Sequence, residues 1–139
     1  DEIPDGVSVE TQTSVEDAVK FVEETQIDLF APSVGNIHGL IKSGEPELNI
    51  KRIKEIAEAV KIPLVLHGAS GNTDEEVGKA IDAGIRIVHI NTELRQAYKK
   101  GVEKGMSTDE LAPYKFMAEG VEEMKKLVIQ KLKVFNKLA

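Results

Sequence analysis

Three histidines are the side chains of this 139-residue sequence best suited to chemistry, and each follows an apolar run. They are His38 in "VGNIHG", His67 in "IPLVLHG" and His89 in "IRIVHIN". Each lies at or near the carboxyl end of a predicted strand, which is the edge where parallel α/β folds bind ligands. The spacing from His38 to His67 fits neighbouring strands, whose ends lie about 5 Å apart. Two imidazoles placed in this way predict a shared metal ion such as zinc, and the alternative is that each is an ordinary structural residue.

Small residues beside two of these histidines indicate an anion site. Gly39 follows His38, and Gly68, Ala69 and Ser70 follow His67. Backbone N–H groups in such turns can approach an anion closely, and the Ser70 hydroxyl is a further donor. The same pattern also suits a strand-to-helix turn that needs small residues for steric reasons alone, so both interpretations stay open.

The end of the third predicted strand, "HINT", is a further candidate contact with substrate. Asn91 and Thr92 follow His89 and Ile90 there. Barrels often hold a phosphate on the loops after their last two strands, where these residues would lie. Thr92 also suits the plain role of a helix cap.

The elements that would position these residues repeat along the chain. Helices are predicted over 13–25, 49–60, 73–84 and 92–101, and extended segments over 27–39, 62–68 and 85–91. Ser14 with Asp17, and Thr73 with Glu76, have the spacing of helix caps, while Pro32 removes one donor from the first extended segment. Three strand-to-helix units imply parallel strands and an α/β fold. A long helix is predicted within 112–139, with an apolar stripe formed by Met117, Val121, Met124, Val128, Leu132 and Phe135.

Composition narrows the classes of partner. A net charge of −6 argues against a general nucleic-acid binder, and no apolar run approaches the length of a membrane-spanning helix. The sequence has no cysteine, which excludes disulfides and thiolate metal sites. We therefore expect a cytoplasmic protein with an aliphatic core that binds neither nucleic acid nor membrane. Its opening residues have the composition of a loop within a domain, which suggests a piece of a longer protein.

The motifs "VGNIHG", "PLVLHGASG" and "INTELRQAY", in this order and followed by an amphipathic helix, resemble the carboxyl-terminal half of class II, zinc-dependent fructose-bisphosphate aldolases. The resemblance implies a (βα)₈ TIM barrel, of which residues 1–139 would form the carboxyl-terminal part of a single domain. The chain would supply roughly the last three βα units and a long terminal helix. It also implies reversible aldol cleavage of a ketose bisphosphate, fructose 1,6-bisphosphate, in glycolysis and gluconeogenesis.

The resemblance also implies roles for single residues. His38 and His67 match two of the three histidines that hold the catalytic Zn²⁺, beside which a second divalent or a monovalent cation can bind. Gly39, Gly68, Ala69 and Ser70 match phosphate-binding positions. His89, Ile90, Asn91 and Thr92 match a segment that contacts substrate. The third zinc histidine and the aspartate that transfers the proton would lie upstream of Asp1, so no catalytic residue is assigned in this chain.

One departure from the family pattern bears on function. The family usually has Asn-x-Asp-Thr where this chain has His89, Ile90, Asn91 and Thr92. Substrate choice is therefore open, with tagatose-bisphosphate aldolase or a non-catalytic phosphosugar-binding barrel as alternatives. A second hypothesis makes His89 a third zinc ligand. The apolar stripe and the resemblance together predict a homodimer or larger homo-oligomer.

Overall fold

The computed structural model describes residues 12–36 and 47–138. These residues form two compact units, which divide between Ile90 and Asn91 and are described separately. The first unit contains α1 (Val15–Thr25), α2 (Ile50–Val60), β1 (Leu64–Leu66), α3 (Asp74–Ala83) and β2 (Ile85–Val88). The second contains α4 (Thr92–Met106), α5 (Pro113–Phe116) and α6 (Ala118–Phe135). The predicted α/β class is thus confirmed for the first unit.

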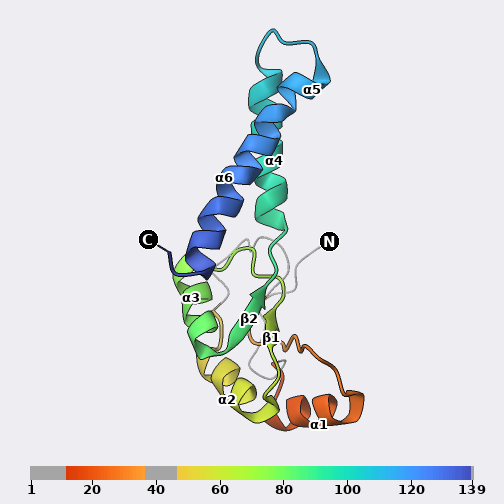
Figure 1. The fold of residues 1–139 in the computed structure, drawn as a ribbon, viewed down its shortest axis with the longest axis vertical. Helices are drawn as coiled ribbons and strands as arrows, with labels where there is room; N and C mark the ends of the chain where they lie inside the picture. Colours follow the sequence, from red (N-terminus) through yellow and green to blue (C-terminus); the bar gives the residue numbers. More distant parts are fainter. Residues whose placement is uncertain (1–11, 37–46, 139) are drawn as a thin grey trace. The chain divides into compact units, whose positions relative to one another are not determined.

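The two strands of the first unit are parallel neighbours (Figure 1). Leu64 pairs with Ile85, and after a register shift Leu66 pairs with Val88. β1 is buried along its whole length, as expected for a strand covered on both faces. The strand predicted over 27–39 is much shorter in its described part, where Phe30 alone forms a parallel bridge to Leu64. Pro32 explains the interruption, because it has no N–H to continue the ladder.

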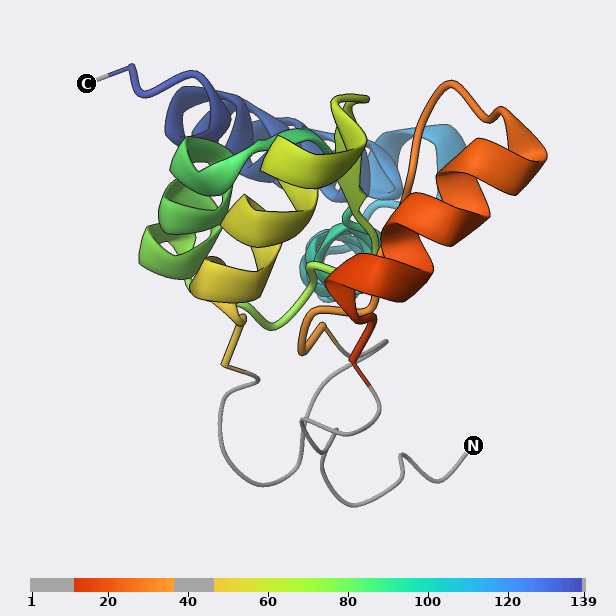
Figure 2. The same cartoon turned by 90° about the horizontal axis from the view of Figure 1, so that it is seen from below.

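All three helices of the first unit begin with a side-chain cap, as predicted for those at Ser14 and Thr73. The Ser14 side chain accepts from the Asp17 N–H at α1, and Asn49 accepts from the Arg52 N–H at α2. Thr73 and Glu76 form the predicted capping box at α3. α2 contacts both of the other helices and lies between α1 and α3 (Figure 2). These helices therefore fix where the adjoining strands begin and end.

The buried core of the first unit is aliphatic, with Phe30 as its one aromatic member among the described residues. Its largest fully buried side chains come from the strands, from α2 and from the segment before residue 36: Ile53, Ile56, Leu64, Leu66, Ile85 and Val34. The strands that carry His67 and His89 at their ends are therefore anchored in this core.

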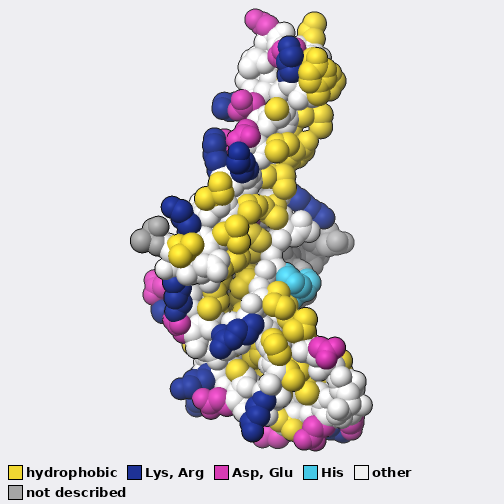
Figure 3. Space-filling model, in the orientation of Figure 1, with side chains coloured by type: hydrophobic (Ala, Val, Ile, Leu, Met, Phe, Trp, Pro, Cys, Tyr) yellow, Lys and Arg dark blue, Asp and Glu magenta, His cyan; other side chains and the backbone are white. Residues whose placement is uncertain are grey.

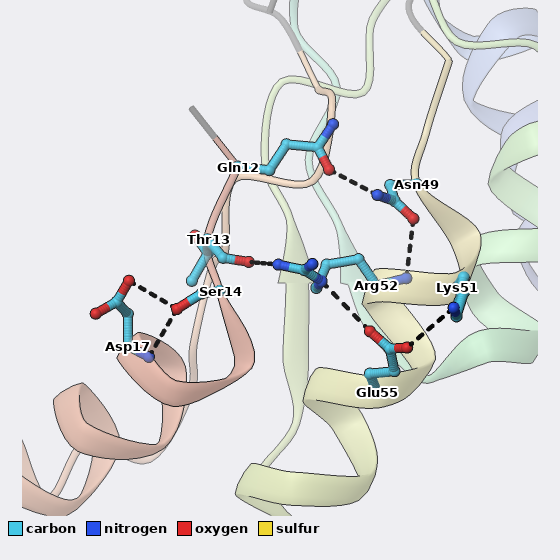
Figure 4. Close-up of polar contacts among 8 residues, drawn as sticks. All are labelled: Gln12, Thr13, Ser14, Asp17, Asn49, Lys51, Arg52 and Glu55. Atoms are coloured by element: carbon cyan, nitrogen blue, oxygen red, sulfur yellow. Dashed lines mark hydrogen bonds and ion pairs between the residues drawn. The ribbon is translucent and has the colours of Figure 1, made fainter. Parts of the chain in front are cut away.

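A polar cluster joins the chain before α1 to the start of α2 (Figure 4). The Arg52 guanidinium donates to the Thr13 carbonyl over 2.9 Å and pairs with Glu55 at 3.4 Å. The Asn49 amide donates to Gln12 Oε1 over 2.8 Å. The bonds from Asn49 to Gln12 and from Arg52 to Thr13 join residues more than thirty positions apart in the sequence. They connect the residues just before α1 to the beginning of α2.

The second unit is a helical hairpin whose two long helices, α4 and α6, lie side by side (Figure 1). α4 was predicted to end near Gly101 but continues to Met106. The reason is packing: a Cβ on Gly101 would overlap the Glu119 carbonyl, and one on Gly105 would overlap the Phe116 carbonyl. Gly120 likewise lies against Tyr98. These glycines serve the close approach of two helices, and neither glycine in α4 ends the helix.

The helix predicted near the carboxyl end is interrupted, with α5 and α6 as separate elements. The predicted stripe does not form a buried face within this chain: Val121 is 57% exposed and Leu132 is 52% exposed. Lys131 is buried instead, and its ammonium pairs with Glu93 of α4 at 2.8 Å. Figure 3 shows apolar side chains at the surface of this unit. Across the described ranges, no helix is long and apolar enough to cross a membrane.

Candidate functional site

His67 and His89 lie next to each other at the carboxyl ends of β1 and β2. They follow the last register pair, Leu66 with Val88, and their ring centroids are 5.3 Å apart at an interplanar angle of 78°. Backbone bonds fix this end of the sheet, because the His89 N–H donates to the Leu66 carbonyl over 2.9 Å and the Ala69 N–H donates to the His89 carbonyl over 3.1 Å. Both histidine side chains are exposed, and histidine is visible at the surface in Figure 3. The two imidazoles are therefore held close together and accessible.

The donor chemistry of this pair fits a zinc ion. An imidazole centre lies about 3 Å from a zinc ion bound through nitrogen, so two rings at the tetrahedral angle have centres about 5 Å apart. The observed 5.3 Å agrees with that spacing. The edge-to-face angle also suits a direct contact between the rings. The arrangement is thus compatible with His89 as a ligand and with His89 as a neighbour of the ligand His67.

The other predicted zinc ligand, His38, lies outside the described residues, as does Gly39 of the phosphate prediction. Within the described ranges, no group of three or more His, Asp or Glu side chains forms a metal site. The predicted proximity of His38 to His67 therefore stays a prediction.

Asn36, which the sequence analysis did not assign, links the segment before residue 37 to His67. Its side-chain oxygen accepts from the Val34 N–H over 2.9 Å, and its amide donates to the His67 carbonyl over 2.7 Å. The motif "VGNIHG" contains this asparagine, but nothing local in the sequence indicates a partner 31 residues away.

The predicted phosphate turn connects β1 to α3. Gly68 and Gly71 have φ of 72° and 105°, a conformation that favours glycine. Ala69 and Ser70 are buried, with 1% and 3% exposure. The Ala69 N–H donates to the His89 carbonyl, which ties this turn to the end of β2. The turn thus combines small side chains with positive-φ glycines, features that anion-binding turns share.

The two ends of the 37–46 segment meet on the first unit. The Asn49 N–H donates to the Val34 carbonyl over 2.8 Å, and a Cβ on Gly35, whose φ is 98°, would overlap the Glu47 carbonyl. Glu76 fixes the returning end, because its carboxylate accepts from the Leu48 N–H over 3.2 Å while it also caps α3. The capping role of Glu76 was predictable, whereas its contact with Leu48 was not.

The remaining predicted substrate residues follow His89 across the boundary between the units. Ile90 is the last residue of the first unit, and Asn91 begins the second as the N-cap residue of α4, with Thr92 as its first helical residue. Thr92 is therefore not the cap itself. The side chain of Asn91 makes no capping bond to the helix.

The pKa shifts in the described part belong to surface pairs away from the histidines. On α3 the Lys79 ammonium, through a 2.6 Å contact and its charge, lowers the pKa of the Glu75 carboxyl. In the second unit the Ala112 N–H and the Lys115 ammonium lower the pKa of Glu110. These pairs affect local helix stability rather than site chemistry.

A family model described as "Fructose-bisphosphate aldolase class-II" matches residues 1–138. The chain belongs to this family. Class II aldolases also appear among its structural neighbours, which agrees with the barrel-type α/β architecture expected from the resemblance.

Similar proteins carry aldolase names. YdjI of Escherichia coli K12 is 38% identical over 124 residues, which is 89% of this chain and 43% of YdjI. The crystal structure of the YdjI aldolase has a TM-score of 0.76 at 36% identity, over 88% of this chain and 44% of that one. A sulfofructosephosphate aldolase from Alkalicoccus urumqiensis is 38% identical over 126 residues, 89% of this chain and 44% of the relative. The chain thus spans less than half the length of these relatives.

Proposed function

We propose that this chain is the carboxyl-terminal part of a zinc-dependent class II aldolase that cleaves fructose 1,6-bisphosphate to dihydroxyacetone phosphate and glyceraldehyde 3-phosphate. The match of the family model to residues 1–138 carries the proposal. The chain covers less than half of each relative, which supports a single barrel domain whose amino-terminal half lies upstream. On this proposal, residues 1–139 supply about the last three βα units of a (βα)₈ barrel and its terminal helices.

His38 and His67 are the proposed zinc ligands of this chain, and an upstream histidine completes the set. The exposed imidazole of His67 at a strand end, with its carbonyl bonded to the Asn36 amide, supports this role. Bound zinc would supply Lewis-acid stabilisation of the negative charge that develops on the ketose when its carbon–carbon bond breaks. Proton transfer falls to an aspartate upstream of this chain.

The turn after β1 is the proposed phosphate site. Gly39, Gly68, Ala69 and Ser70 would surround one phosphate. Because the Ala69 N–H donates to the His89 carbonyl, Ala69 would contribute a small side chain rather than a donor, and the positive φ of Gly68 supports close backbone approach. His89, Ile90, Asn91 and Thr92 would contact the rest of the substrate. Holding a remote phosphate orients the reacting carbon and lowers the barrier to cleavage.

Besides fructose 1,6-bisphosphate, two other ketose phosphates are candidate substrates of the same aldol cleavage. A tagatose bisphosphate, which differs from fructose 1,6-bisphosphate only in stereochemistry at one carbon, is the runner-up. Histidine and asparagine at positions 89 and 91 change the hydrogen-bonding groups of the substrate segment. The similarity to a sulfofructosephosphate aldolase makes a sulfonated ketose phosphate a third substrate to assay. A non-catalytic phosphosugar-binding barrel is the alternative outside enzymes.

We further propose a cytoplasmic homo-oligomer. The exposed apolar residues of α6, such as Val121 and Leu132, support burial against another surface in the complete protein. Light scattering on the complete protein tests this part, and a monomer at micromolar concentration would contradict it.

The experiment that tests the function uses the complete protein. Zinc per chain is measured by elemental analysis, and cleavage of fructose 1,6-bisphosphate, tagatose 1,6-bisphosphate and sulfofructose phosphate is measured with and without chelator. We expect one tightly bound zinc and chelator-sensitive cleavage, with both lost in His67→Ala. Cleavage that survives removal of the metal would contradict the zinc mechanism, and phosphosugar binding without cleavage would favour the non-catalytic alternative.

A further inference from the structure

Backbone hydrogen bonds connect Phe30 to β1, but a side chain makes the next connection, at the candidate ligand His67. The Phe30 N–H donates to the Pro63 carbonyl over 3.2 Å, and the Val65 N–H donates to the Phe30 carbonyl over 2.8 Å. These are two consecutive bonds of a parallel ladder. In a regular ladder the next donor would be the residue at position 32, but Pro32 has no N–H.

Two residues further, a regular ladder would have the Val34 N–H donate directly to the His67 carbonyl. The structure has the Asn36 side chain between these groups instead. Its Oδ1 accepts from the Val34 N–H over 2.9 Å, and its Nδ2 donates to the His67 carbonyl over 2.7 Å. The side-chain amide therefore acts as an inserted peptide group that restores the link which Pro32 interrupts.

The link acts on the backbone of His67, where orientation matters for a metal ligand. On its other side the sheet is fixed by the bond from the His89 N–H to the Leu66 carbonyl. Asn36 therefore supplies the restraint from the opposite neighbour. Outer contacts that hold a ligand in place typically change metal affinity by about 10- to 100-fold when they are removed.

We infer that Asn36 is a positioning residue that fixes the backbone of His67 for zinc binding. The inference rests on the proposed function, because it needs zinc at His67. Asn36 acts through the His67 carbonyl and is given no contact with substrate.

The first test is zinc affinity, measured on the complete protein by competition with a chromophoric chelator. Asn36→Asp keeps the oxygen that accepts from Val34 but places a second acceptor against the His67 carbonyl. We expect zinc affinity to fall about 10-fold or more. Asn36→Ser is too short to reach His67 and adds no charge, so it should fold and lose affinity in the same direction.

Asn49→Asp is the matched control. It makes the same chemical change in the same unit, keeps the acceptor for the Arg52 N–H, and loses only the bond from its amide to Gln12. Thermal melting of the metal-free proteins measures the structural cost of each change. We expect Asn49→Asp to keep the zinc affinity of the parent, even if its melting temperature is lower.

The outcomes separate the two proposals. A parent protein that binds no zinc would overturn both the function and the positioning role. A parent that binds zinc, with Asn36→Asp and Asn36→Ser at parental affinity, would overturn the role of Asn36 alone. The same would follow if Asn49→Asp lowered zinc affinity as much as the Asn36 variants did, because the loss would then reflect general destabilisation.

Discussion

Gly101→Ala tests whether glycine is required where α4 meets α6. An added Cβ would lie 2.6 Å from the Gly120 Cα and 2.6 Å from the Glu119 carbonyl carbon, whereas ordinary contacts begin near 3.4 Å. These atoms are backbone, so no side-chain rotation relieves the overlap and the helices must separate locally. Overpacking of this kind costs about 1 to 3 kcal/mol, and the better helix propensity of alanine returns up to about 1 kcal/mol. Because backbone must move, we place the overpacking cost at about 2 to 3 kcal/mol, so the free energy of unfolding should fall by about 1 to 2 kcal/mol after the helix propensity is included.

Gly78→Ala is the matched control, because it makes the same change within α3. A Cβ there has no atom within 4 Å, so only the helix propensity changes. We expect the free energy of unfolding to rise by about 0.5 to 1 kcal/mol. The two identical substitutions should therefore have opposite signs.

Urea unfolding of the complete protein, followed by circular dichroism, measures both variants. Hydrogen exchange of peptides within α4 and α6 then locates the effect, which should be confined to these helices for Gly101→Ala. If Gly101→Ala were as stable as Gly78→Ala, the close approach of the two helices would not determine the residue at position 101.

Three further changes test other contacts. Ser70→Ala in the complete protein should weaken binding of a bisphosphate ketose by about 1.5 to 3 kcal/mol at unchanged zinc content, and equal affinity by calorimetry would make Ser70 a turn residue only. Lys131→Met leaves the half-buried Glu93 carboxylate without this cation and should destabilise the protein by about 1 to 3 kcal/mol in urea, whereas Lys104→Met, whose pair with Glu119 is exposed, should cost about 1 kcal/mol or less. The lowered pKa of Glu110 means that its contribution to stability is present above the unfolded pKa and is lost as the pH falls through the folded pKa. Glu110→Gln should therefore weaken the fall of the melting temperature as the pH is lowered below about 4.5, and an unchanged fall would contradict a lowered pKa of Glu110.

Features with a local physical cause were predictable from the sequence. The capping box of Thr73 and Glu76 depends on residues three positions apart, and the structure confirms it. The buried strand before His67 follows from a continuous apolar run. The placement of His67 and His89 at one sheet edge follows from parallel pairing, and their rings do lie together.

Features that depend on distant partners were not predictable. Gly101 indicates a helix end when its neighbours in sequence are considered, but its contact with α6 allows the helix to continue. Lys131 is not part of the predicted apolar stripe, yet it is buried, and its ammonium pairs with Glu93 of another helix. The bond from Asn36 to His67 spans 31 residues, and no short motif encodes it.

The hydrogen bonds on either side of residues 37–46 have a consequence for sequence changes within that stretch. Val34 bonded to Asn49, and Leu48 bonded to Glu76, keep both ends in place independently of the residues between them. We therefore expect substitutions among residues 37–46 to leave both flanking bonds and the α3 cap unaltered, so that the chemistry of that stretch can change without a change in the framework on either side of it.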